Sequence, residues 1–542
     1  MWRYLCPPIQ SLDVQGLVVP VRSVAGTPGM MLNDTRQRGI LLAGVIIALA
    51  LHILRTAPSL NPASLWLDDL WVAVLVKHAS VGMVPELGAH VPLGFIAIQK
   101  LFHGLISDPE LSMQLFPYLC SLLLIPAVTL AVFALSRDLP TAWMAALITA
   151  VSPLIDTGIR NKPYASDALV CFLLFFLFYR CRQQRTFRLY ALLAAAALIS
   201  VLFSYVSIFF GFVLVNLLNA HALRDRRNQG VGPKSILLSA LGFNVCLALL
   251  YFVFLRGSAN QSLADFWMEY FVPIHGVGAF FGFCFERGGT FVTGPFPKAL
   301  WWMSIVVIPG LVWLVSRWRL LGLGALGIYG CVWVASALGK YPIGGGRTDT
   351  FAYPLTILLS VVGLYAVTDR LKSEPGRRLR WVLVLALAVF VFHRSATTPV
   401  RYVPDTSAEY LRLAAENTRA GDAIIIFPHG NFALGYYGSW PVELAPVSYY
   451  AAGFEVRLPT EPSLTLPAIV DGRSYRDDPE VLTPLIADFL NGRFPRVIYF
   501  SGHVGKEVSR HIQWAIKSQG YTASRSENGR ANDVVVFEKT QS

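Results

Sequence analysis

Charged residues are scarce in this sequence. Only 14% of its 542 residues are Asp, Glu, Lys or Arg, whereas soluble domains average roughly 25%. Hydrophobic residues make up 54%, and the mean hydropathy is +0.52. These values exclude a soluble enzyme with a single core, and they exclude a disordered chain. Long apolar stretches recur along most of the sequence and predict a polytopic α-helical membrane protein.

Cysteine is also rare, and it is missing from the C-terminal region. The seven cysteines form no C-x-x-C pair, and none follows Cys331. A zinc or redox site built on paired cysteines is therefore not expected. The N-terminus lacks the basic segment and short apolar segment of a signal peptide. Because Met30 and Met31 stand just before the first apolar run, they are candidate start residues beside Met1.

The net charge of +12 arises from 45 Lys and Arg against 33 Asp and Glu. Basic residues gather in short loops between apolar segments, which is typical of cytoplasmic loops, so no nucleic-acid partner is predicted. Segment 90–106 is apolar but carries four polar side chains, and we expect it to lie flat at the interface. About eleven spans are then expected, at 39–56, 112–135, 141–156, 166–180, 188–203, 205–222, 235–255, 299–316, 320–338, 350–368 and 379–393.

This count places the four strongest basic clusters on the same side as the N-terminus, which is the cytoplasm. Segments 57–111, 157–165, 256–298 and 339–349 are then outside, together with the C-terminal region. We predict three parts: a disordered cytoplasmic segment 1–38, a transmembrane domain 39–395 that includes outer loop 57–111, and an extracytoplasmic α/β domain 396–542. The last should contain helices at 408–418 and 504–518 and strands at 423–427, 496–500 and 533–538.

The first outer loop carries an acidic pair, Asp68 and Asp69, between large apolar residues. Such carboxylates are costly at a membrane surface unless they are solvated or used. One of them would suit a general base that takes a proton from an acceptor hydroxyl. A solvated loop with interfacial Trp anchors is the alternative. His90 opens segment 90–106 and would face the same cavity.

Cations in two other outer loops depart from the positive-inside pattern. Arg160 and Lys162 suggest an anionic ligand such as a phosphate, and Asp167 is placed to orient either of them. Arg347 follows three glycines at the start of a span, where a phosphate would also meet backbone N–H groups, although a plain turn explains the glycines equally well. The long aromatic loop 256–298 contains Glu269 and suits a mobile substrate-binding loop.

The order of these motifs resembles the GT-C membrane glycosyltransferases, especially bacterial members similar to protein O-mannosyltransferases and aminoarabinose transferases. Those families have an acidic pair, a His-Pro-Pro-Leu or Lys-Pro stretch, an Arg loop leading to an Asp, and a Tyr-Pro-x-Gly-Gly-x-Arg segment. The matching segments here are Asp68-Asp69, His90–Leu93, Arg160 with Asp167, and Lys340–Arg347. This chain departs at Asp69, where Glu is commoner, and at Val91, where Pro or Lys is commoner.

The resemblance implies inverting transfer of a sugar from a polyprenyl-phosphate donor to an envelope glycan, lipid or protein on the outer face of the cytoplasmic membrane. It implies that Asp68 is the base and that Asp69 holds the acceptor or a neighbouring cation. A divalent metal is possible, because some members use one. The implied donor-phosphate residues are Arg160, Lys162, Arg347 and His90, and the implied acceptor or loop contacts are Asp167, Tyr164, Glu269 and Tyr341.

Two other classes of protein stay open. A lipid or polysaccharide transporter would carry ionisable residues inside its spans, whereas here charges gather in loops. A non-catalytic partner in envelope assembly would use the C-terminal domain as a binding module, and Asp68 would then be dispensable.

Overall fold

The structure is a computed structural model. It describes residues 35–540 apart from 61, 63, 64, 185, 186, 225–232, 256–265, 372, 401–406, 420, 448–451, 460, 461, 467–478, 502–505 and 529–532. The expectation of a disordered segment 1–38 therefore falls largely outside the described residues. Its last four residues are helical, because the first helix begins at Thr35.

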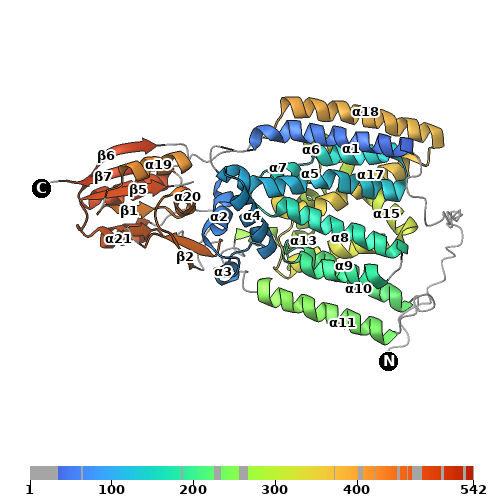
Figure 1. Cartoon of the computed structure of the whole chain (residues 1–542), viewed down its shortest axis with the longest axis horizontal. Coiled ribbons are helices and arrows are strands. Elements are labelled where there is room, and N and C mark those ends of the chain that lie inside the picture. The colour runs from blue at the N-terminus through green and yellow to red at the C-terminus, as the bar shows by residue number, and fades with distance from the viewer. Residues whose placement is uncertain are drawn as a thin grey trace.

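Apolar helices form a bundle with roughly parallel axes, and a smaller sheet-containing domain lies at one end of it (Figure 1). Among the described residues, nine helical segments are long and apolar enough to cross a membrane. Helices α6 (Leu139–Val151) and α9 (Phe187–Ser200) are apolar but shorter. With these two, every predicted span corresponds to a helix. The nine long segments are α1 (Thr35–Thr56), α5 (Pro109–Ser136), α8 (Tyr164–Gln184), α10 (Ser207–Arg224), α11 (Pro233–Leu250) with η4 (Tyr251–Leu255), η7 (Lys298–Ser304) with α15 (Val307–Arg317), α16 (Arg319–Ala337), η8 (Arg347–Ala352) with α17 (Tyr353–Thr368), and α18 (Ser373–Thr397).

Small residues let two of these helices touch backbone to backbone. A Cβ atom on Gly310 of α15 would lie 1.8 Å from the carbonyl oxygen of Leu359 in α17. A Cβ atom on Gly363 of α17 would lie 1.9 Å from the carbonyl oxygen of Val306. Close packing of this kind holds helices together in lipid, where burial of apolar surface supplies no driving force.

The C-terminal domain has a five-stranded sheet of order β4-β1-β5-β7-β6. Strand β1 runs parallel to β4 and β5, while β7 is antiparallel to β5 and β6. The three predicted strands are confirmed to within one residue as β1, β5 and β7, and the two predicted helices as α19 and α22. The elements are α19 (Ser407–Asn417), β1 (Ala423–Ile426), α20 (Pro428–Tyr437), β2 (Glu443–Pro446), β3 (Phe454–Arg457), β4 (Ser463–Thr465), α21 (Pro479–Leu490), β5 (Arg496–Ser501), α22 (Lys506–Ser518), β6 (Tyr521–Asn528) and β7 (Asp533–Lys539).

Three short helices of the first outer loop lie between the bundle and the sheet: α2 (Leu67–His78), α3 (Met83–Glu86) and α4 (Leu93–Leu105) (Figure 1). Leu70 and Val74 of α2 share one hydrophobic core with Ile424 of β1, Phe432 of α20 and Phe500 of β5. The other face of the sheet packs against α21 and α22 in a separate core. The predicted boundary at 395 therefore separates outer loop 57–111 from the domain with which it packs.

Candidate active site

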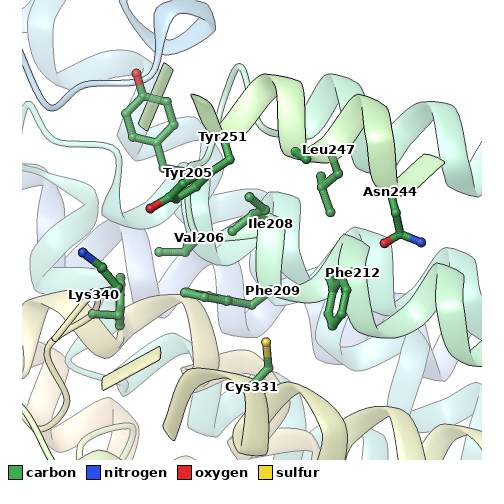
Figure 2. Close-up of a pocket in the computed structure, with 12 residues that line it drawn as sticks. Tyr205, Val206, Ile208, Phe209, Phe212, Asn244, Leu247, Tyr251, Cys331 and Lys340 are labelled. Carbon is green, nitrogen blue, oxygen red and sulfur yellow. The ribbon is translucent and has the colours of Figure 1, made fainter. Parts of the chain in front are cut away.

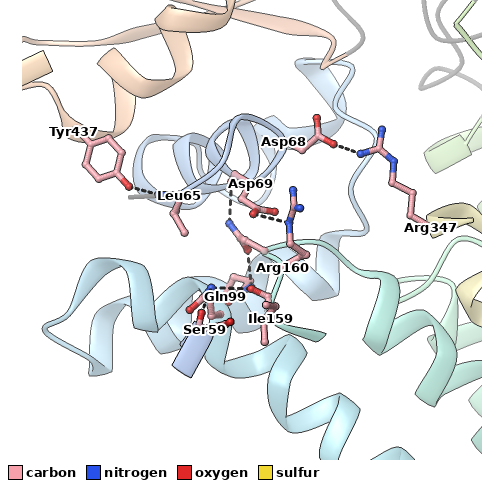
Figure 3. A network of polar contacts seen from close by, with 11 residues as sticks. Ser59, Leu65, Asp68, Asp69, Gln99, Ile159, Arg160, Arg347 and Tyr437 are labelled. Atoms are coloured by element: carbon pink, nitrogen blue, oxygen red, sulfur yellow. Dashed lines mark hydrogen bonds and ion pairs between the residues drawn. The ribbon is translucent and has the colours of Figure 1, made fainter. Parts of the chain in front are cut away.

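The acidic pair lies in the first turn of α2, where the positive end of the helix dipole favours negative charge. The two carboxylates point to different partners, because successive helix residues face different directions. Asp68 forms an ion pair with Arg347, and Asp69 forms one with Arg160 (Figure 3). Segments from the first outer loop, the second outer loop and the end of the membrane region therefore meet at this turn.

Asp69 is held by a buried polar network. Its side chain is fully buried, and Arg160 Nε donates to its Oδ2 at 2.9 Å. Asn161 donates to the backbone carbonyl of Asp69 at 3.1 Å, and Gln99 of α4 donates to Asn161 Oδ1 at 2.8 Å. Gln99 also donates to the carbonyl of Met113 in α5. Of the two roles expected for Asp69, the structure gives it the one of holding a cation.

Asp68 is partly accessible, with 24% of its side chain exposed. Burial tends to raise its pKa, but the positive charges of Lys162, Arg347 and Arg160 outweigh this effect and hold the pKa of Asp68 below its usual value. The carboxylate is therefore ionised at neutral pH, and it is the more accessible member of the pair.

Lys162 is buried beside the acidic pair, with 6% of its surface exposed. Its Nζ lies 3.6 Å from the centroid of the Trp71 ring, a distance typical of a cation–π contact. Burial lowers the pKa of Lys162 to about 7, although Asp68 and Asp69 oppose the shift. When Lys162 is protonated, three cations face two carboxylates, and this surplus of one positive charge suits an anionic ligand.

His90 lies close enough to Lys162 to interact with it electrostatically. Burial and the positive charge of Lys162 together lower the pKa of His90 to about 4, so the imidazole is neutral at physiological pH. Its Nε2 atom is buried and has no hydrogen-bond partner among the residues that the structure describes. The fold thus brings together two residues that were expected to bind the phosphate, His90 and Lys162, although they are 72 residues apart in the sequence.

The glycine-rich loop uses its N–H groups internally. Gly344 and Gly346 donate to the carboxylate of Asp349 at 3.3 and 3.2 Å, and the N–H of Arg347 donates to the carbonyl of Gly345 at 2.9 Å. Asp349 and Gly345 thus accept hydrogen bonds from three of the backbone N–H groups at which a phosphate contact was expected. The loop contributes to the site through the side chain of Arg347.

The other residues predicted to contact the acceptor or the loop differ in how close they lie to the acidic pair. Tyr164 is close enough to Arg347 and Asp68 to interact with both electrostatically. Asp167 instead hydrogen-bonds Ser204, so its expected role in orienting Arg160 falls to Asp69. Tyr341 donates to the carbonyl of Thr348 at 2.6 Å, one residue beyond Arg347.

Glu269 lies in the described part of the long aromatic loop. Its carboxylate interacts with Arg287 at 3.9 Å and is 61% exposed, so it belongs to a separate surface pair. The same loop reaches the site through Trp267, whose ring centroid lies 5.9 Å from Arg347 Cζ. Much of this loop is helical, in η5 (Met268–Tyr270), α13 (Val277–Phe283), η6 (Cys284–Gly288) and α14 (Gly289–Thr293).

An apolar cavity of about 490 Å³ lies between α10, α11 and α16 (Figure 2). Lys340 and Tyr205 lie at one end of it and Asn244 at the other. Tyr205 donates to the carbonyl of Val91, next to His90, at 3.1 Å. The end with the cation is therefore the end nearest the acidic pair. The other lining residues include Val206, Ile208, Phe209, Phe212, Leu247 and Tyr251.

The sequence analysis missed several residues that shape the site. Interfacial anchoring was one of the two alternatives for the tryptophans of this loop. In the structure the rings of Trp66 and Trp71 stack on Arg160, at 4.3 Å, and on Lys162. Their positions on either side of the acidic pair were the available signal. Asn161 lies between the two predicted cations and drew no attention because an amide carries no charge.

A divalent metal does not fit these donors. In the part of the chain that the structure describes, no three His, Cys, Asp or Glu side chains come together. The two available carboxylates are each engaged by an arginine, and buried Lys162 adds positive charge to the same place.

Comparison with solved structures identifies the fold. The archaeal oligosaccharyltransferase AglB from Archaeoglobus fulgidus, in complex with an inhibitory peptide and a dolichol-phosphate, matches 93% of this chain and 74% of its own, with a TM-score of 0.52 and 11% identity. ArnT from Cupriavidus metallidurans in the apo state matches 93% of this chain and 98% of its own, with a TM-score of 0.52 and 13% identity. No family model and no curated protein matches the sequence.

These likenesses confirm the predicted fold class. The chain is a multi-pass α-helical membrane protein with a GT-C-like fold and a C-terminal sheet-containing domain.

Proposed function

We propose that the protein is a membrane glycosyltransferase that moves a sugar from a polyprenyl-phosphate-linked donor to an acceptor hydroxyl or amine on the outer face of the cytoplasmic membrane. The observation that carries the proposal is the ionised, partly accessible carboxylate of Asp68 beside Arg347 and Lys162. A base and a set of phosphate-binding cations are the two parts that such a transfer needs.

Asp68 accepts the proton of the attacking acceptor group. The acceptor atom bonds to the anomeric carbon as the bond from that carbon to the phosphate oxygen breaks, and attack from the opposite side inverts the configuration. The leaving group is the polyprenyl phosphate, whose negative charge increases as the bond breaks. Arg347 and Lys162 stabilise that charge, which makes an acid catalyst unnecessary.

The ion pair between Asp68 and Arg347 gives the donor a role in preparing the base. A donor phosphate competes with Asp68 for the guanidinium of Arg347. Binding of the donor then leaves the Asp68 carboxylate with fewer partners and available to the acceptor. Asp69 remains with Arg160 and keeps the turn of α2 in place.

The apolar cavity supports a lipid-linked donor. Its aromatic and aliphatic walls suit part of an isoprenoid chain, and Lys340 lies at the end nearer to the acidic pair. One of the two solved neighbours also supports this substrate class, because it is an oligosaccharyltransferase in complex with a dolichol-phosphate. A transporter is less favoured, because it has no need of a base held beside phosphate-binding cations.

The test is consumption of a synthetic polyprenyl-phosphate sugar by the purified protein, with release of polyprenyl phosphate as the readout. Asp68→Asn keeps the size of the side chain but removes its basicity, and turnover should fall at least about a hundredfold. Glu86→Gln is the matched control, since Glu86 is an exposed acid of the same outer loop, on α3. Full turnover by Asp68→Asn would overturn the role of Asp68 as the base. No donor consumption by the wild-type protein would contradict the enzyme class and favour a non-catalytic partner.

A further inference from the structure

Among the described residues, the C-terminal domain contacts the helix that carries the acidic pair chiefly through helix α20. Gly435 lets α20 come close to α2, since a Cβ atom there would lie 3.2 Å from Val74 of α2 and 3.0 Å from Val456 of β3. Polar contacts fix the far end of α2 to the same helix. His78 donates to the carbonyl of Gly435 at 2.8 Å, and Lys77 donates to the carbonyl of Tyr436.

Tyr437 fixes the near end of α2. Its hydroxyl accepts a hydrogen bond from the N–H of Leu65 at 2.7 Å, three residues before Asp68 (Figure 3). The same hydroxyl hydrogen-bonds the carboxylate of Glu110 in α5. Tyr437 therefore links the entry to α2, the C-terminal domain and a membrane helix through one oxygen atom.

The segment that Tyr437 holds leads directly into the site. Leu65 is fully buried, and the next residue, Trp66, has its ring 4.3 Å from Arg160 Cζ. Arg160 in turn is the partner of Asp69. A shift of the backbone at Leu65 would move the Trp66 ring and, with it, the first turn of α2.

We propose that Tyr437 is a positioning residue of the candidate active site, through which the C-terminal domain sets the position of Asp68 and Asp69. This inference rests on the proposed transferase function. In this view the domain is a structural part of the catalytic centre, and its contribution passes through the hydrogen bond to Leu65 and the ring of Trp66. Misplacement of a catalytic group by about 1 Å can lower a rate by as much as about a hundredfold, so the bond is a sensitive point.

The chain supplies a matched control in the neighbouring residue. Tyr436 also donates from its hydroxyl to a backbone carbonyl across the same junction, that of Pro109, at 3.0 Å. Tyr436→Phe and Tyr437→Phe therefore each remove one tyrosine hydroxyl from the contact between the C-terminal domain and the rest of the protein. Only Tyr437→Phe removes a bond to the segment that precedes Asp68.

Two measurements on the full-length purified variants test the inference. In hydrogen–deuterium exchange, Tyr437→Phe should speed exchange in peptides that cover residues 65–78, and Tyr436→Phe should leave these peptides close to wild type. In transfer assays, Tyr437→Phe should lower kcat about tenfold to a hundredfold with donor KM within about twofold of wild type, while Tyr436→Phe keeps kcat.

Unchanged exchange at 65–78 in Tyr437→Phe overturns the positioning role, whatever the activity of the protein. Equal losses of kcat in the two variants overturn it as well, because they point to general docking of the domain. Failure of the proposed function shows itself separately, as absence of donor consumption by the wild-type protein. The exchange measurement still decides the positioning role in that case.

Discussion

Arg347 and Asp68 are 279 positions apart in the chain, and their side chains form an ion pair at the junction of the membrane helices with the C-terminal domain. Both side chains keep partial exposure, 35% for Arg347 and 24% for Asp68. The pair is therefore reachable by a ligand, whereas the neighbouring pair of Arg160 with Asp69 has a fully buried carboxylate. An exchangeable pair beside a fixed pair suits a site that must release one cation to its substrate.

Arg347→Lys should raise the donor KM about tenfold or more. Lysine keeps the charge but loses the bidentate fork, and charge-assisted hydrogen bonds are worth roughly 1.5–3 kcal/mol. Arg287→Lys is the control, because Arg287 pairs with Glu269 and Glu286 rather than with the acidic pair. Steady-state kinetics with a synthetic donor provide the measurement. A donor KM that stays at the wild-type value in Arg347→Lys would contradict phosphate binding by this residue.

Donor binding should weaken as pH rises through about 7. Burial lowers the pKa of Lys162 to about 7, so its positive charge is present below that pH and lost above it. A phosphodiester donor keeps its charge throughout the range. Lys162→Met should bind the donor weakly at every pH and flatten the profile, which is measured as donor KM between pH 6 and 8.5.

His90→Gln serves as the control for this pH profile. The pKa of His90 is lowered to about 4, so the imidazole stays neutral between pH 6 and 8.5. The variant should keep the wild-type shape of the profile, whatever its absolute KM. A flattened pH profile in His90→Gln, together with an unchanged profile in Lys162→Met, would show that Lys162 is not the residue that titrates.

The predicted topology places the C-terminal domain outside and the loop before α18 in the cytoplasm. Ser439 and Arg370 are exposed positions on these two sides. In intact cells, Ser439→Cys should react with an impermeant thiol reagent, and Arg370→Cys should react only after lysis. The parent protein gives the background from native cysteines. The reverse pattern would move the acidic pair to the cytoplasmic side.

Alanine at Gly310 or Gly363 should disrupt the contact between α15 and α17. An added Cβ would lie under 2 Å from a backbone oxygen in either case, which no change of side-chain rotamer relieves. Overpacking typically destabilises by about 1–3 kcal/mol, and a backbone clash belongs at the upper end. Gly330→Ala in α16 is the control, since nothing lies within 4 Å of its added Cβ. Thermal unfolding in detergent is the measurement, and equal melting temperatures for the three variants would contradict the close crossing.

Most of the fold could be predicted from the sequence, because apolar length identifies membrane helices without knowledge of their partners. Strands β1, β5 and β7 could also be predicted, because each is a short apolar run. Strand β6 was missed because most of its residues after Tyr521 are polar, and residues 522–526 face solvent at the edge of the sheet. Strand β4 was missed because it has only three residues.

The candidate site could be predicted only as a set of residues. Their positions in outer loops predicted that Asp68, Lys162 and Arg347 belong to one site. No local sequence pattern, however, indicates which carboxylate pairs with which cation. The role of Asp349 was hidden for a similar reason, since its carboxylate satisfies glycine N–H groups through a turn that only the fold defines. The contact of Tyr437 with Leu65 joins positions 372 apart, beyond the reach of any periodicity.

The core shared by α2 and the C-terminal sheet can form only late in synthesis of the protein. The ribosome makes Leu70 and Val74 more than 300 residues before Ile424 and Phe500, which complete their packing. Until the last strands are made, the side of α2 that packs on the C-terminal domain has no cover. A nascent or prematurely terminated chain would thus insert its helices yet expose this apolar surface, which promotes aggregation. The acidic turn near the start of the chain can therefore complete its packing only after the carboxyl-terminal domain has been made.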